Sequence, residues 1–122
     1  MAKLPNFTFH IKSVFDKPED SDGFRVLVDR MMPPQLSAEE ARVDLVLGDA
    51  APSNKLRKWL RENPQEWDEF LWRYEREMDE RGYAVTELFQ KATSGVITLL
   101  YNDGDVQFNQ AVALRAYLLG DI

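Results

Sequence analysis

The chain has 122 residues, of which 44% are hydrophobic and 30% charged, with a formal net charge of -6 and no cysteine. This composition predicts one globular domain over residues 1–122, and it excludes disulfides and thiolate chemistry. The acidic balance disfavours nucleic acid as a partner. No apolar run approaches the roughly 20 residues of a membrane span, and residues 1–6 lack the apolar core of a signal peptide. We therefore expect a cytoplasmic protein with no membrane partner.

The first segment predicts a strand with one apolar face. Phe7, Phe9 and Ile11 alternate with polar residues, which is typical of a strand near a sheet edge. His10, the single histidine, falls on the polar side, where we expect it to be exposed. With one histidine and no cysteine, zinc binding of the usual kind is disfavoured, and no metal site is predicted.

Residues 25–30 predict a buried strand that ends in two charged side chains. The apolar run Val26 to Val28 follows a loop rich in turn-forming residues and leads into Asp29 and Arg30. Side chains alternate along a strand, so these two point to opposite faces and do not pair with each other. Ligands of open α/β sheets bind beyond the carboxyl ends of strands. Both residues are therefore ligand-binding candidates, and a structural ion pair with a covering helix is the alternative.

The next segment offers a helix and then a strand. Ser37 and Glu40 have the spacing of a capping box, which predicts a short helix. The apolar residues 43–47 predict a third strand, or else a continuation of that helix.

A basic helix is predicted after residue 52, with Ser53 as its N-cap. Arg57 lies one turn from the start of this helix, where it would face an anionic ligand or Asp29. Ser53 would cap the helix and also donate to the ligand. The alternative for the basic residues 55–61 is a solvated helix face.

Two further helices are predicted before the second buried strand. Asn63 as N-cap, Pro64 at the first helical position and Gly82 as a stop indicate a helix over 64–81. Trp72 lies off its apolar stripe. A second helix covers about 85–92.

Residues 96–101 predict the second buried strand, followed by Asn102. A last helix should begin near Val106, with Asp103 or Asp105 as its cap, and end at Gly120. Together these elements predict an α/β fold, with a mixed or mainly parallel small sheet covered by about five helices in Rossmann-like layers.

Several motifs occur in an order that resembles one family. They are Ile11-Lys-x-Val14-Phe-Asp16, Asp22-Gly-Phe-Arg-Val-Leu-Val-Asp-Arg30, Ala51-Pro-Ser53, Leu56-Arg57-x-Trp59, Thr98-Leu-Leu-Tyr101 and Asn109-x-Ala111. This order resembles the YeaO-like family of small bacterial proteins, domain of unknown function 488. The resemblance spans nearly the whole chain and implies an α/β domain without an assigned activity.

Two departures from that family bear on chemistry. Family members typically carry leucine-tryptophan-proline-arginine-glycine after the Asp-Arg pair, whereas this chain has Pro34 in place of the arginine. Near the last helix the family has asparagine-histidine-alanine, whereas this chain has Gln110 in place of the histidine. Proline has no side-chain donor and glutamine does not titrate. If those residues serve chemistry in relatives, this chain lacks a guanidinium clamp and a general base.

The sequence therefore favours a small-molecule or nucleotide-type binding domain with an anionic ligand, which could be a diverged enzyme. No nucleophile and base stand at a recognisable spacing, and no cofactor is indicated. The ligand-binding candidates are Asp29, Arg30, Ser53, Arg57, Asn102 and Asn109. The alternative is an interaction module or homodimer that uses Trp72, Met31 and Met32.

Overall fold

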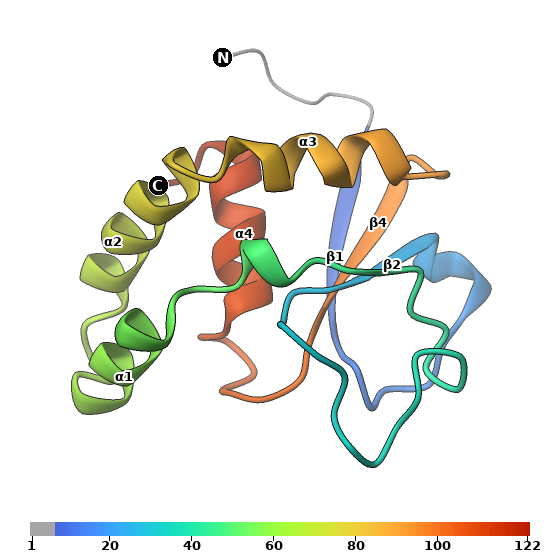
Figure 1. Ribbon diagram of the computed structural model, residues 1–122, viewed down its shortest axis with the longest axis horizontal. Coiled ribbons are helices and arrows are strands. Elements are labelled where there is room, and N and C mark those ends of the chain that lie inside the picture. The colour runs from blue at the N-terminus through green and yellow to red at the C-terminus, as the bar shows by residue number, and fades with distance from the viewer. Residues whose placement is uncertain (1–6) are drawn as a thin grey trace.

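The computed structural model describes residues 7–122. Its sheet has four strands in the order β1-β4-β2-β3, and all pairs are parallel (Figure 1). The strands are β1 (Thr8–Ser13), β2 (Phe24–Leu27), β3 (Leu45–Val46) and β4 (Val96–Tyr101). The predicted α/β class is confirmed, β1 does lie at a sheet edge, and the strand alternative for residues 43–47 is correct.

The helices of residues 7–122 are α1 (Asn54–Glu62), α2 (Trp67–Asp79), α3 (Gly82–Lys91) and α4 (Gln110–Leu119), with 3-10 turns η1 (Asp20–Asp22) and η2 (Gly48–Ala50). There are four α-helices in this part of the chain rather than about five, because the stretch after Ser37 forms only a helical turn. Ser37 and Glu40 exchange their capping hydrogen bonds. Arg42 then adopts a left-handed conformation, with φ 51°, and ends the turn after a few residues.

Two helices begin later than predicted, because the expected capping residues form other hydrogen bonds. Asn63 does not open α2, because its side-chain amide donates to the Trp59 carbonyl (2.9 Å) and closes α1 instead. Asp105 does not cap α4, because its carboxylate accepts from the Gln107 and Phe108 backbone N–H groups in a local turn. The cap of α4 is Asn109. Gly82 also differs from its predicted role, since it is the first residue of α3 rather than a stop.

The two faces of the sheet have different covers. One face carries Val26, Ile97 and Leu99, which pack in one buried cluster with apolar residues of all four helices. The other face carries Leu27 and Leu100, which pack in a second cluster with Ala41 and with residues of the loop around it. The helices thus form one layer, and the loop after β2 covers the opposite face.

A buried arginine fastens that loop to the sheet. Arg25 is 3% exposed. Its guanidinium donates to the Ala41 carbonyl (2.9 Å) and to the Asp22 carboxylate (2.5 Å). The loop that would otherwise hold the predicted helix is therefore ordered by a side chain from β2. Within residues 7–122, no helix combines the length and the apolar character that crossing a bilayer would require.

Candidate functional site

Asp29 joins four elements at the carboxyl edge of the sheet. It follows β2, where the Val28 N–H still donates to the Leu100 carbonyl of β4 (2.9 Å). Its Oδ1 lies 2.6 Å from Nη2 of Arg57 on α1. Its Oδ2 accepts from the backbone N–H of Asn102 (3.0 Å) and from Nε2 of Gln110 (2.6 Å). The ends of β2 and β4 therefore meet at one point.

The contacts of Asp29 match the requirement for a buried carboxylate. The residue is 5% exposed, and a buried charge without partners costs several kcal/mol, roughly. One cation and two neutral donors satisfy it here. The contact with Arg57 is the ion pair with a covering helix that the sequence predicts as the structural alternative for Asp29.

A small cavity opens beside this carboxylate. It measures about 230 Å³ and is lined by Asp29, Arg30, Met31, Asn54, Arg57 and Asn102. Four of the six predicted site residues therefore come together around one cavity. Asn54 is the first residue of α1, whose first turn contains no acidic residue, and a helix N-terminus favours anions.

The two arginines of the cavity differ in their contacts. Arg57 is paired with Asp29, but its buried Nε has no hydrogen-bond partner in residues 7–122. Arg30 is exposed and forms no ion pair within the same residues. The residues that line the cavity thus include two arginines and one aspartate.

The other two predicted residues serve their helices. Ser53 caps α1 by accepting from the Leu56 N–H (3.1 Å), as predicted, but its hydroxyl donates to the Glu77 carboxylate on α2 (2.5 Å). Asn109 is 3% exposed and accepts from the Val112 N–H (3.0 Å) as the cap of α4. Neither side chain lines the cavity beside Asp29.

Sequence reasoning missed three residues of this site. Met31 lines the cavity, although the sequence suggests it only for an interaction surface. The sequence marks Gln110 only by the absence of a histidine, yet its side-chain amide donates to Asp29. Asn54 was not singled out. The position of Asn54 and Gln110 in the sequence could have identified them, because each is the first residue of a helix and follows its capping residue.

The arrangement can hold an anion, but it offers little acid–base chemistry. None of the side chains that line the cavity is a histidine, serine or lysine, and His10 lies on β1. Within residues 7–122, no three His, Asp or Glu side chains gather in a way that could hold a metal ion. The site is therefore suited to recognition by charge and hydrogen bonds.

Comparison with known proteins agrees with the sequence motifs. A family model described as "Inactive DUF488-N3 subclade" matches residues 8–122. "Uncharacterized protein Rv3073c" from Mycobacterium tuberculosis (strain ATCC 25618 / H37Rv) is 33% identical over 110 residues, which cover 90% of this chain and 92% of that protein. "Uncharacterized protein YeaO" from Escherichia coli (strain K12) is 30% identical over 107 residues, which cover 88% and 93%. No solved structure matches significantly. The predicted family resemblance is confirmed: the chain belongs to the DUF488 family, in the group described as its inactive N3 subclade.

Proposed function

We propose that this protein binds a small anionic molecule of nucleotide type in the cavity beside Asp29, without transforming it. The observation that carries the proposal is the charge imbalance of the cavity. Two arginines, Arg30 and Arg57, line the same cavity as the single acidic residue, Asp29. A bound phosphate or carboxylate group would complete the charge balance.

The size of the cavity limits how much of the ligand it holds. At about 230 Å³ it lies below the roughly 300–1,000 Å³ of pockets that enclose a whole drug-sized ligand. We therefore infer that an anionic group enters and the rest of the molecule lies outside. Arg30 would contact the anion from the solvent side, while Asn54 and Asn102 would orient it.

Binding is favoured over catalysis by the side chains present. Asp29 already accepts hydrogen bonds from Arg57, Asn102 and Gln110, which occupy three of the roughly four acceptor positions of a carboxylate and favour its structural role over proton transfer. Gln110 occupies the position where the family resemblance implies a histidine. The description of the matched subclade as inactive is consistent with a domain that binds without reacting.

The test is a calorimetric titration with inorganic phosphate and with adenosine monophosphate. Arg30→Gln should weaken binding by about tenfold, because a charge-assisted hydrogen bond is lost, while the Asp29–Arg57 pair stays intact. The matched control is Arg76→Gln, which removes the same charge from the exposed side of α2. Equal weakening by both variants would show that only the overall charge matters, and it would contradict the proposal.

A second candidate function is an interaction module or homodimer. Trp72 is 50% exposed and Met31 is 73% exposed. Both exposed fractions are high for large apolar side chains. Met32, in contrast, packs against the second core cluster. Light scattering separates the two functions. A monomer of 14.2 kDa whose thermal unfolding temperature rises with added anions supports ligand binding. A dimer of twice that mass supports the interaction module if Trp72→Lys dissociates it.

A further inference from the structure

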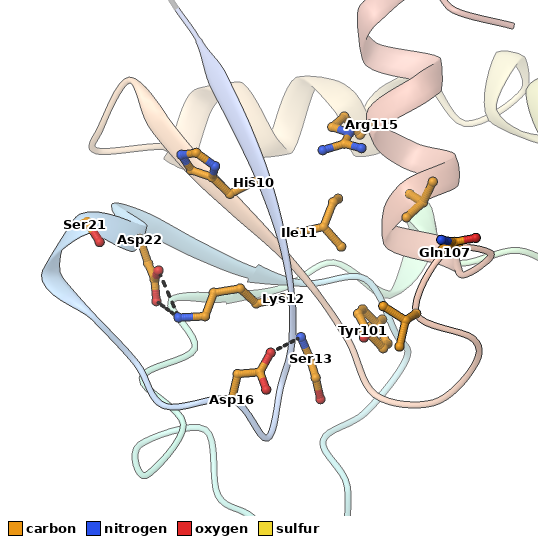
Figure 2. A pocket seen from close by; sticks show the side chains of 12 residues that line it. His10, Ile11, Lys12, Ser13, Asp16, Ser21, Asp22, Tyr101, Gln107 and Arg115 are labelled. Atoms are coloured by element: carbon orange, nitrogen blue, oxygen red, sulfur yellow. Dashed lines mark hydrogen bonds and ion pairs between the residues drawn. The ribbon is translucent and has the colours of Figure 1, made fainter.

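A second cavity lies away from Asp29, around the free edge of β1. It measures about 920 Å³ and is bordered by β1, the end of β4, the loop after it and α4 (Figure 2). This volume falls within the range of roughly 300–1,000 Å³ that encloses a whole small molecule. This volume is shared between the two sides of β1, because the lining side chains lie on both of them.

β1 divides the cavity into two chemically different sides. Side chains alternate along a strand, and Figure 2 shows Lys12 directed towards Asp22 while Ile11 is directed towards α4. On the first side, Lys12 Nζ lies 3.1 Å from Asp22 Oδ2, and Asp22 also pairs with the buried Arg25. The charged side chains on this side thus form ion pairs with one another, and they attract a charged ligand only weakly.

The side next to α4 has an unmatched cation. Arg115 is half-buried on α4, and its guanidinium forms no ion pair with any residue of 7–122. Figure 2 shows its guanidinium turned towards β1. Asp16, the remaining carboxylate of the cavity, accepts from the Ser13 backbone N–H (3.0 Å) at the far end of β1. A half-buried cation without a counterion is suited to an external anion.

Apolar surface lies beside this cation. Ile11 of β1 and Val112 of α4 line the same side of the cavity, together with the ring of Tyr101 at the end of β4. Gln107 lines it as well, and within residues 7–122 no hydrogen bond involves the Tyr101 hydroxyl or the Gln107 side-chain amide. The wall therefore offers one charge, an apolar patch and two free polar groups, which is the usual composition of a small-molecule site.

We propose that this α4 side of the cavity binds a small organic anion with an apolar body. Arg115 holds the carboxylate or phosphate group, and the body lies against Ile11, Val112 and the Tyr101 ring. Tyr101 and Gln107 donate hydrogen bonds to polar atoms of the ligand. This site is separate from the cavity beside Asp29 and does not depend on the function proposed for it.

The first test uses the unaltered protein and three probes in a titration followed by amide NMR shifts. Benzoate has both an anionic group and an apolar body, benzamide has the body without the charge, and inorganic phosphate has the charge without the body. Benzoate should produce saturable shifts at Ser13 and Val112. Benzamide and phosphate should each bind at these residues at least about tenfold more weakly, because each lacks one of the two contacts.

The second test removes the cation. Arg115→Gln should weaken benzoate binding by about tenfold, whereas Arg76→Gln, with the same charge change on α2, should leave it unchanged. Circular dichroism verifies that the variants are folded, and the comparison of probes on the unaltered protein stands even if Arg115→Gln does not fold.

Three results would overturn the proposal. One is benzoate shifts confined to Met31 and Asn54, which would place the anion in the other cavity. Another is equal binding of benzoate and benzamide. The third is the absence of saturable shifts at Ser13 and Val112.

Discussion

Asp29 shows how one buried side chain connects distant parts of the chain. Its carboxylate is the common acceptor for Arg57 of α1, the backbone of Asn102 and Gln110 of α4. Because these donors come from separate elements, the residue both orders the candidate site and ties the carboxyl edge of the sheet to the helix layer. We therefore expect it to contribute to stability as well as to binding.

Asp29→Asn should lower the free energy of unfolding by about 2 kcal/mol. The substitution keeps the shape of the side chain, but it removes the charge that balances Arg57 and places an NH2 group against other donors. Arg57 is partly exposed, with 29% of its side chain accessible, so water reduces the penalty below that of a fully buried pair. Urea denaturation measures the change.

Asp49→Asn is the matched control for this substitution. Asp49 is exposed and forms no ion pair within residues 7–122, so the change should stay within about 0.5 kcal/mol. Similar losses for the two variants would contradict the role assigned to Asp29.

Asp22 is the second buried carboxylate, and its surroundings predict a pH dependence. Burial raises the pKa of Asp22, but hydrogen bonds from the Glu19 backbone N–H, Lys12 and Arg25 outweigh it. The pKa of Asp22 therefore lies below its ordinary value of 3.8. A carboxyl with a lowered pKa in the folded state contributes stability that is present above its unfolded pKa and is lost as the pH falls through its folded pKa.

The stability difference between the unaltered protein and Asp22→Asn should therefore shrink in acid. Urea denaturation from neutral pH to below 3.8, the ordinary pKa, measures this difference. Asparagine does not titrate, so the variant lacks this part of the pH dependence. A difference that stays constant over the whole range would show that the carboxyl is not stabilised by its partners.

At the scale of elements, the caps decide where helices begin. Ser53 is the cap of α1, as predicted. The serine directly precedes the basic amphipathic run, so the start of this helix is well defined by the sequence. The start of α4 was not predicted, since Asp103, Asp105 and Asn109 are all good caps. Asn109 is selected by its burial and by its own donation to the Asp105 and Val106 carbonyls (2.8 and 3.2 Å).

Asn109→Ala should therefore destabilise the protein by about 1–2 kcal/mol, the usual effect of losing a helix cap. Asn109→Asp should lose less, because the aspartate retains the oxygen that accepts from the Val112 N–H and loses only the amide donor. Thermal unfolding of the two variants measures the difference. Equal losses of stability in the two variants would mean that the hydrogen bonds from the Asn109 amide to the loop, rather than the helix cap, stabilise the protein.

At the scale of the molecule, the sheet depends on close approach between distant segments. Gly23 precedes β2 with φ 64°, and a Cβ there would lie 2.2 Å from the Val96 carbonyl oxygen at the start of β4. Glycine permits this backbone conformation and this contact. The β2–β4 pairing at the centre of the sheet therefore requires residue 23 to have no side chain.

Gly23→Ala should cost more than about 2 kcal/mol, since neither backbone can move without breaking the pairing. Gly82→Ala is the matched control, because nothing lies within 4 Å of a Cβ at that position and alanine favours the helix by up to about 1 kcal/mol. Thermal unfolding should show a large loss for the first and no loss for the second. An equal effect would contradict the steric explanation.

The sequence alone determined the α/β class, the two buried strands, the basic helix capped by Ser53 and the family. It also placed Asp29, Arg30, Arg57 and Asn102 in one candidate site. These features depend on local periodicity and on the rule that parallel strands present their carboxyl ends at one edge.

Only the tertiary structure decided the rest. The third hydrogen-bond partner of Asp29, Gln110, lies 81 residues away from it, and the cavity beside Arg115 is formed by segments from both ends of the chain. The helical turn after Ser37 is limited by the left-handed Arg42 and held by the buried Arg25. No local pattern encodes such contacts, because each depends on how the strands are ordered and on which polar group finds a partner when water is excluded.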